Sequence, residues 1–240
     1  MKFSIIIPIL NEEKNILNLT NKIKKTLNNY KYEIIFVDDN SEDNSKIVLS
    51  NLKKKNKNIR FFIRKNKIRD LFQSCSLGIK NSKYQYNLIM DGDSQHDPRY
   101  IPEMLQKLYN NYDVVVACRN FDNKKKIGLN IFRLLGSKVF RFFVYLILGK
   151  KTLDPMSGYF VFKKSIFLEN KNLFYGYGFK ILSDMIYNVN NLKISDIIIN
   201  FRYRKLGKSK MNFRVIMQII FFILFCFFRK NLNIYLRIRW

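Results

Sequence analysis

The sequence predicts an α/β fold: a mostly parallel sheet with helices on both faces, followed by apolar helices toward the C-terminus. Short hydrophobic runs rich in β-branched residues alternate with stretches of helical periodicity over residues 4–118, as expected for buried parallel strands. Connections of this length favour right-handed crossovers between parallel strands. The 240 residues, 48% of them hydrophobic, suffice for one sizeable core and exclude a disordered chain.

The elements of the first half follow one another in regular order. Residues 4–10 form a continuous apolar run, and the helix after them has apolar side chains at helical spacing as far as Leu27. Asn11 is expected to cap that helix, with Glu12 and Glu13 in its first turn, where the helix dipole favours acids. Later strands are expected at 33–37, 59–63, 86–90 and 113–118, and later helices at 41–55, 70–81 and 98–111.

Polar side chains gather where the predicted strands end. Because ligands of such sheets bind beyond the carboxyl ends of the strands, we expect the functional site at this edge. The residues concerned are Asn11 and Glu12 after the first strand, Asp38 and Asp39 after the second, Asp91 and Asp93 after the fourth, and Arg119 after the fifth.

Two apolar stretches mark the second half. Residues 127–148 are interrupted by cations, whereas residues 215–228 are almost wholly apolar. As a helix the latter would span about 21 Å, short of the roughly 30 Å hydrocarbon core of a bilayer. We expect both to lie in a membrane interface, with flanking cations on anionic headgroups; ordinary core helices are the alternative. Between them we expect strands at 154–162 and 197–203 and a helix at 179–189.

Charge narrows the choice of partners. The chain carries 44 Lys and Arg against 18 Asp and Glu, a net +26, which implies an anionic partner: nucleic acid, a membrane surface or a phosphorylated substrate. The cations are scattered or border apolar stretches, and no nucleic-acid-reading motif is visible, so no nucleic-acid partner is expected. The three cysteines lack disulfide or metal spacing and the N-terminus lacks a signal peptide, which favours the cytoplasm.

A candidate metal site follows the fourth predicted strand. Asp91 and Asp93 are separated by Gly92, which permits a bend that turns both carboxylates toward one hard cation. Such oxygen ligands suit Mg²⁺ or Mn²⁺, with a substrate diphosphate completing the coordination. Gln95 is placed to add a neutral oxygen. A solvated turn is the alternative on spacing alone, and the position opposite Asp39 favours the metal.

Several motifs together resemble a known family. The chain resembles family-2 glycosyltransferases of the GT-A fold in three segments. These are residues 4–13, Val37-Asp38-Asp39 with Ser41 and Asp43, and residues 90–98. Further motifs resemble the dolichol-phosphate mannosyltransferase-like branch, whose members glycosylate polyprenyl phosphates: residues 154–162, residues 178–180, and Arg204 with residues 207–210. The resemblance implies a GT-A domain over 1–212, with acceptor- or membrane-facing helices at about 127–150, and a membrane-associated apolar and basic segment over 213–240.

The resemblance also implies a set of site residues. Part of the set holds the nucleoside, part holds a divalent metal, Mg²⁺ or Mn²⁺, and part surrounds the phosphates. The nucleotide-sugar-binding set is Pro8, Glu12, Val37, Asp39, Asp91, Gly92, Asp93, Arg119, Lys180, Arg204 and Lys210; Asp91, Asp93, Arg204 and Lys210 are the implied catalytic residues, and Asp91, Asp93 and Gln95 the implied metal ligands.

The chain departs from the family pattern at three places. Leu10 stands where an aromatic residue is usual, and residues 69–76 lack the glycine-rich pattern often found there, although Gly78 is kept. Gly92 stands where alanine is more frequent, which is expected to be harmless. The first departure leaves the stacking of the nucleobase, and hence guanine versus uracil, open.

Elementary chemistry supports the implied reaction. A polyprenyl phosphate carries an ionised oxygen near neutral pH and needs no general base. The enzyme must hold two anions together and neutralise the departing diphosphate, which a metal, arginine and lysine can do. His96 is expected to fix the metal loop through a structural hydrogen bond, with contact to the donor as the alternative. Asp154 is expected to shape the acceptor end, and Asp184 is either a structural partner or an organiser of the phosphate site.

The sequence thus leads to a functional hypothesis with two alternatives. The hypothesis is an inverting transfer of a hexose, with mannose or glucose favoured, from a GDP- or UDP-linked sugar to a polyprenyl phosphate. The enzyme would be attached peripherally to the cytoplasmic face of the cell membrane, through an anionic membrane surface. One alternative is a family-2 enzyme with a saccharide acceptor in surface polysaccharide synthesis, which needs a carboxylate base such as Asp97, Asp154 or Asp184. A remote alternative is a basic nucleic-acid-binding protein without catalysis.

Overall fold

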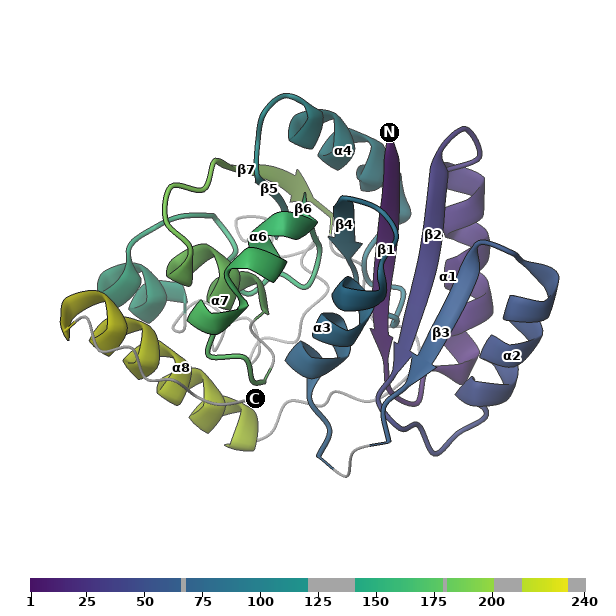
Figure 1. Cartoon of the computed structure of the whole chain (residues 1–240), viewed down its shortest axis with the longest axis horizontal. Helices are drawn as coiled ribbons and strands as arrows, with labels where there is room; N and C mark the ends of the chain where they lie inside the picture. The colour runs from purple at the N-terminus through teal and green to yellow at the C-terminus, as the bar shows by residue number, and fades with distance from the viewer. Residues whose placement is uncertain (66–67, 121–140, 179–180, 201–212, 233–240) are drawn as a thin grey trace.

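The computed structural model describes residues 1–65, 68–120, 141–178, 181–200 and 213–232. A seven-stranded sheet crosses the molecule in the order β3-β2-β1-β4-β6-β5-β7, with helices on both of its faces (Figure 1). The strands are β1 Lys2–Ile9, β2 Lys31–Asp38, β3 Ile59–Ile63, β4 Tyr86–Ile89, β5 Val114–Arg119, β6 Phe160–Lys163 and β7 Ile194–Ile199.

The direction of the strands decides where the functional edge lies. β1 pairs in parallel with β2 and β4, β2 with β3, and β5 with β7. β6 is antiparallel and lies between β4 and β5, so β4 and β5 still run in the same direction. The carboxyl ends of β1, β2, β4 and β5 therefore share one edge of the sheet. The predicted mostly parallel α/β fold is confirmed.

The helices connect these strands and cover the sheet. Among the described residues, two short 3₁₀ turns, Pro98–Tyr100 and Lys171–Leu173, accompany them, and residues 141–148 are also helical. The helices are α1 Glu13–Thr26, α2 Ser45–Lys55, α3 Leu71–Asn81, α4 Ile101–Tyr109, α6 Lys164–Glu169, α7 Ile181–Asn188 and α8 Phe213–Leu232.

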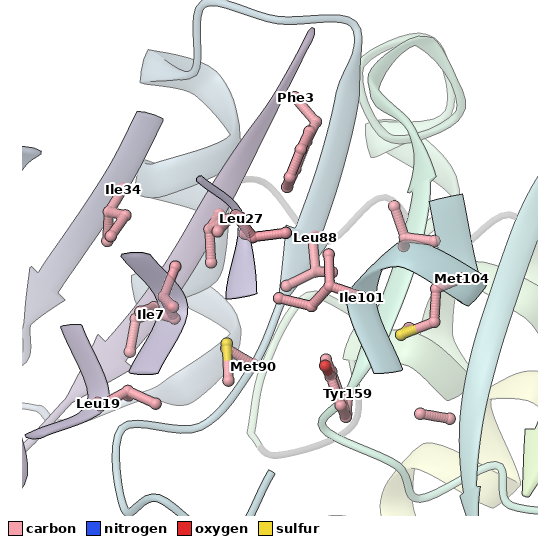
Figure 2. Close-up of a cluster of buried hydrophobic side chains, with 14 of the residues drawn as sticks. Phe3, Ile7, Leu19, Leu27, Ile34, Leu88, Met90, Ile101, Met104 and Tyr159 are labelled. Atoms are coloured by element: carbon pink, nitrogen blue, oxygen red, sulfur yellow. The ribbon is translucent and has the colours of Figure 1, made fainter. Parts of the chain in front are cut away.

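Alternation along β1 divides the core between the two faces of the sheet. Phe3, Ile5 and Ile7 point to a cluster with α1 and α4, part of which is drawn in Figure 2. Ile6 points to the opposite face, where it packs with side chains of α3 and α7. Because β1 is buried on both faces, its sequence reads as a continuous apolar run. Each fully buried side chain of this size contributes about 1.5–3 kcal/mol relative to an exposed one.

A third cluster joins α8 to the helix at 141–148. Val144 and Leu148 pack there against the inner face of α8, which contributes Phe222 and Phe225. The outer faces of the same two helices leave large apolar side chains exposed. Within the described residues, no helix combines the length and the hydropathy needed to cross a bilayer. The exposed apolar residues of these helices are Phe142, Phe143, Leu146, Ile220, Phe221, Leu224, Phe227 and Phe228.

Four local predictions differ from the structure. The helix expected over 41–55 begins only at Ser45, because Ser41 and Asp43 bond the backbone of the loop after β1. Asn11 does not cap α1: its backbone is left-handed, with φ 55°, and its side-chain oxygen accepts the Glu42 N–H instead. β6 begins at Phe160 because the residues from 154 onward form a turn, and the helix α6 that follows was not predicted. β7 begins at Ile194, earlier than the predicted 197, and the predicted end of that strand lies outside the described residues.

Gly78 sets the distance between α3 and the sheet. A Cβ atom at this position would lie 2.5 Å from Ile6 Cγ2 and 3.2 Å from Val37 Cγ2. Both atoms belong to β-branched side chains in fully buried strands, so neither has room to move away. The helix therefore packs this closely only because residue 78 has no side chain.

Gly78→Ala is expected to destabilise the protein. Overpacking costs about 1–3 kcal/mol, whereas the gain in helix propensity is at most about 1 kcal/mol, so the free energy of unfolding should fall. Urea unfolding followed by circular dichroism measures this change. Lys80→Ala, at an exposed position of the same helix, should change the free energy of unfolding by less than about 0.5 kcal/mol. An unchanged or higher stability of the Gly78 variant would contradict the packing described.

Candidate active site

The loops after β1 and β2 are bonded to each other at the functional edge. The Asn11 N–H donates to Ser41 Oγ at 2.9 Å, and the Glu12 N–H donates to Ser45 Oγ at 3.1 Å. Asp38 holds the second loop, because its Oδ1 accepts from both the N–H and the hydroxyl of Ser41. Asp38 thus orients its loop. The Glu12 carboxylate is buried in the same region.

Pro8 and Val37 form the floor beneath these loops. They are partners in the β1–β2 register and both are buried. Gly92 lies close to the same strand: a Cβ on it would come 2.6 Å from Ile9 Cγ2 and 3.5 Å from the Pro8 carbonyl oxygen. In this chain the glycine is therefore matched to the bulk of Ile9, and an alanine would require Ile9 to shift.

Asp39 lies in a buried network that includes an arginine and a second aspartate. Its Oδ1 pairs with the Arg64 guanidinium, and its Oδ2 accepts the Asp70 N–H at 2.7 Å. Burial raises the pKa of Asp39, and the charge of Arg64 opposes that rise. Sequence reasoning did not select Arg64 or Asp70. The available signals were that Arg64 directly follows a predicted strand and that Asp70 begins a predicted helix.

The Asp91–Asp93 loop leaves β4 at the same edge. The Asp91 side chain is 39% exposed, whereas Asp93 is buried and its Oδ1 accepts the Gln95 N–H at 3.0 Å. Ser94, between Asp93 and Gln95, adopts a left-handed backbone with φ 62°, an uncommon conformation for a residue other than glycine. Of the two carboxylates, Asp91 is therefore the more accessible to solvent.

His96 fixes this loop from behind. Its Nδ1 accepts the Asp91 N–H at 3.0 Å, and its ring stacks on Tyr159 with the centroids 4.9 Å apart. Burial lowers the pKa of His96 to about 4, although the charge of Asp93 opposes the shift. The imidazole is therefore neutral at pH 7, with its proton on Nε2, because Nδ1 is an acceptor. This geometry is the structural hydrogen bond that the sequence favoured for His96.

The turn at 154–158 packs over Asp91. Asp154 grips the Arg119 guanidinium with two bonds, of 2.6 and 2.8 Å, and Ser157 Oγ donates to the Ala117 carbonyl at 2.7 Å. A Cβ on Gly158 would lie 3.0 Å from each carboxylate oxygen of Asp91. Gly158 therefore leaves open the space beside the Asp91 oxygens. The Arg119 guanidinium, expected near phosphates, is held here by a buried aspartate.

The residues present fit a hard divalent cation. Carboxylates and an amide oxygen are the ligand types that Mg²⁺ and Mn²⁺ prefer, and the absent side chain of Gly158 keeps the Asp91 oxygens accessible. No group of three or more His, Cys, Asp or Glu side chains suited to a metal occurs in the described part of the chain.

Asp184 organises a loop at the far side of the site. Its Oδ1 accepts the Tyr175 N–H at 2.8 Å and its Oδ2 accepts the Gly176 N–H at 2.7 Å. Asn188 also donates to Oδ1. Burial raises the pKa of Asp184 to about 7, although these N–H donors and the charge of Arg229 oppose the rise. Three predicted phosphate-binding residues, Lys180, Arg204 and Lys210, lie outside the described residues.

Comparison with known proteins adds a family to this geometry. Residues 4–170 match the family described as glycosyl transferase family 2. The chain belongs to this family. A dolichol-phosphate mannosyltransferase of Pyrococcus furiosus is 30% identical over 225 residues, which cover 91% of this chain and 61% of that protein. One of Saccharomyces cerevisiae is 29% identical over 230 residues, covering 91% of this chain and 84% of that protein. The predicted family resemblance is confirmed.

Solved structures share the fold of this family-2 glycosyltransferase. Glucosyl-3-phosphoglycerate synthase from Mycobacterium tuberculosis, crystallised with Mn²⁺, UDP-glucose and glycerol 3-phosphate, has a TM-score of 0.72 at 15% identity. The match covers 94% of this chain and 80% of that protein. At this identity the likeness concerns the fold, which is the predicted GT-A type. The chain spans 61% of the length of the Pyrococcus relative, so the activity of the whole protein is treated below as a proposal.

Gly158→Ala is expected to weaken metal binding at Asp91. The added methyl group would lie 3.0 Å from both oxygens and force the carboxylate to rotate, so the dissociation constant for Mn²⁺ should rise at least about tenfold. Calorimetric titration of Mn²⁺ in the presence of UDP or GDP measures this change. Leu153→Ala, at an exposed position of the same segment, should leave the affinity unaltered. A folded Gly158 variant with the wild-type affinity would contradict the role assigned to Gly158 in keeping the Asp91 oxygens accessible.

Proposed function

We propose that the protein is an inverting hexosyltransferase that moves a sugar from a nucleoside diphosphate to a polyprenyl phosphate. The observation that carries this proposal is the Asp91–Asp93 carboxylate pair, which leaves β4 at the same edge as the buried Asp39 network. Family membership supports a glycosyl donor, and the names of the Pyrococcus and yeast relatives support a polyprenyl phosphate acceptor and mannose.

The nucleoside would lie over the ends of β1 and β2. Pro8, Val37, Glu12 and Asp39 form the floor and wall of that edge. Arg64 pairs with Asp39 and holds the Asp39 carboxylate in place at this edge. GDP- and UDP-linked donors both fit this description, and the complex of the Mycobacterium structure with UDP-glucose supports a nucleotide-sugar in general.

The diphosphate would lie against the Asp91 loop. Asp91, Asp93 and Gln95 would hold Mg²⁺ or Mn²⁺, and the Mycobacterium complex with Mn²⁺ supports a divalent ion. When bound, the ion neutralises charge that develops on the departing diphosphate. His96 keeps Asp91 in place through its backbone N–H and, being neutral, adds no competing charge. Arg204, Lys210 and Lys180 are proposed to supply the remaining positive charge around the phosphates.

The acceptor phosphate would attack without help from a base. Its oxygen is already ionised near neutral pH, so the protein needs only to position it and to exclude water. A single displacement of this kind inverts the configuration at the anomeric carbon. The turn at 154–158 packs over Asp91, which makes it the part of the described chain best placed to shape the acceptor end.

The three candidate bases already make structural contacts, which favours a phosphate acceptor over a saccharide acceptor. A sugar hydroxyl must lose its proton to a base, and three carboxylates were candidates for that role. Asp97 caps the 3₁₀ turn and pairs with Arg99, Asp154 grips Arg119, and Asp184 holds a loop backbone. Each of these carboxylates therefore has a structural task already. A phosphate acceptor avoids the requirement.

The outer face of α8 and of the helix at 141–148 supports peripheral attachment to an anionic membrane. Neither segment contains an acidic residue. The exposed aromatic and aliphatic side chains named above lie among cations, of which Arg141, Lys150, Lys151 and Arg229 are described. Such a surface suits an amphipathic element in the headgroup region. We therefore retain the division into a catalytic part, 1–212, and a membrane-associated part, 213–240, at the cytoplasmic face of the cell membrane.

Asp91→Asn and Asp93→Asn are expected to abolish transfer. Purified protein is incubated with Mg²⁺ or Mn²⁺, labelled GDP- and UDP-sugars and a polyprenyl phosphate, and lipid-extractable label is counted. Without either carboxylate the metal ion should no longer be held beside the diphosphate, and the rate should fall at least about 100-fold. Asp113→Asn is the matched control, because this carboxylate accepts a hydrogen bond from the Lys193 N–H at the opposite end of the sheet, away from the proposed site.

Other outcomes of the same assay separate the alternatives. Full metal-dependent transfer by either aspartate variant would refute the assigned metal site. Label that appears only on saccharide acceptors would favour surface polysaccharide synthesis instead. Arg204→Ala and Lys210→Ala should slow turnover in a folded protein, and wild-type rates in both would remove them from the phosphate site.

Phe221→Ser combined with Leu224→Ser is expected to reduce membrane binding. Both side chains are exposed on α8, so the change should weaken pelleting with anionic liposomes without unfolding the protein. Leu17→Ser combined with Ile47→Ser, at exposed apolar positions of α1 and α2, is the matched control and should pellet like the wild type. Equal loss in both double variants would argue against a specific membrane face.

A further inference from the structure

Asp70 stands where two parts of the proposed site meet. It lies directly before α3, in the segment where the family's glycine-rich pattern is missing, and it is buried. Its backbone belongs to the nucleotide side: the Asp70 N–H donates to Asp39 Oδ2 at 2.7 Å, and its carbonyl accepts from Arg64 Nη1 at 3.0 Å. These two bonds tie Asp70 to the ion pair at the ends of β2 and β3.

The side chain of Asp70 bonds to the loop at 174–178, on the other side of the proposed site. Its Oδ2 accepts the Gly178 N–H at 2.7 Å, while its Oδ1 caps α3 by accepting the Gln73 N–H at 2.9 Å. Two further bonds join the same helix end to the same loop. The Phe72 N–H donates to the Gly178 carbonyl at 2.9 Å, and Gln73 Nε2 donates to the Gly176 carbonyl at 3.0 Å.

The loop at 174–178 is held through its backbone. Gly176 and Gly178 adopt left-handed conformations, with φ 77° and 82°, which a side chain would strain. Asp184 grips the first half of the loop, and the turn that begins α3 grips the second half. The place of the loop therefore follows the place of Asp70, and the chain continues from Gly178 through Phe179 to Lys180.

We propose that Asp70 is a positioning residue that couples the nucleotide side of the site to the loop at 174–178. A nucleotide at the Asp39 edge would tighten the Asp39–Arg64 pair, and Asp70 passes that constraint to Gly178 through one short hydrogen bond. Coupling of this kind needs a continuous set of packed and bonded groups, which the Arg64–Asp39–Asp70–Gly178 chain supplies. The inference rests on the proposed nucleotide site but not on the identity of the acceptor.

Asp70→Ser separates the two roles of the side chain. A serine still caps α3, because its hydroxyl accepts the same backbone N–H, but it is too short to reach Gly178 as well. The backbone bond from residue 70 to Asp39 is retained. A merely structural role predicts lower stability and equal losses in binding and turnover. Coupling predicts that nucleotide binding no longer affects the loop at 174–178, while the affinity for nucleotide changes little.

Hydrogen exchange followed by mass spectrometry tests this without requiring the acceptor. In the wild type, UDP or GDP with Mn²⁺ should slow exchange in the peptide that covers residues 174–178. In Asp70→Ser that peptide should exchange faster and no longer respond to nucleotide, while the nucleotide dissociation constant changes by less than about threefold. In the transfer assay the same variant should lower kcat at least about tenfold, with the donor KM within about threefold.

Two further variants complete the experiment. Asp113→Asn removes a carboxylate that holds a loop backbone at the opposite end of the sheet, and it should alter neither readout. Gln73→Ala breaks only the bond to Gly176, and it should change loop exchange and kcat in the same direction but less. If Asp70→Ser fails to fold, this variant tests the coupling in its place.

The failures are distinguishable. If the wild type transfers sugar and Asp70→Ser matches it in exchange and kcat, the inference is overturned and the proposed function stands. If the wild type binds nucleotide and only the variant loses loop protection, but no donor gives transfer, the inference stands and the proposed function fails. If nucleotide does not protect the loop in the wild type, the coupling is overturned.

Discussion

Buried negative charge at one edge of the sheet is the constraint on which the rest of this molecule depends. The chain carries a net charge of +26, yet Asp38, Asp39, Asp70, Asp93, Asp154 and Asp184 are all buried. An uncompensated buried carboxylate is costly, and Asp39, Asp70, Asp154 and Asp184 are each compensated by a cation or by several N–H donors. The contacts that satisfy this requirement are also the ones that fix the loops of the proposed site.

The buried carboxylates are compensated in two ways, by arginine side chains or by backbone N–H groups. Arg64 and Arg119 neutralise Asp39 and Asp154 directly, which builds rigid walls on either side of the Asp91 loop. Asp184 relies instead mainly on backbone N–H groups and thereby sets the path of a loop. Asp91 differs from both, because its side chain is 39% exposed and opens toward the space left by Gly158. Within this edge, accessibility singles out the carboxylate best suited to meet a ligand.

The sequence predicted the strands well, and also the edge at which the polar strand ends meet, because both depend on local pattern. A strand buried on both faces must be apolar throughout, and β3 was located to the residue at Ile59–Ile63. The carboxyl ends of parallel strands meet at one edge whatever the loops do, which brought Asp39 and Asp91 to the same side. The family assignment followed from the same residues.

What the sequence missed depends on tertiary contacts. Asn11 looked like a helix cap, but its side chain accepts an N–H from the neighbouring loop, which no local rule foresees. Arg64 and Asp70 carried no motif, since their importance comes from a shared contact with Asp39. The apolar stretch of α8 was ambiguous for a related reason. One of its faces packs on the core and the other does not, and a nearly uniform apolar sequence does not distinguish them.

The reversed direction of β6 has a consequence for how enzymes of this design diversify. β5 ends at the functional edge, and because β6 is antiparallel to it, β6 begins at that same edge. The long connection between Arg119 and Phe160 therefore leaves and re-enters the sheet at neighbouring points. Closing a longer or shorter connection between such points costs little extra entropy. The connection can therefore change in length while the strands on either side of it stay in register.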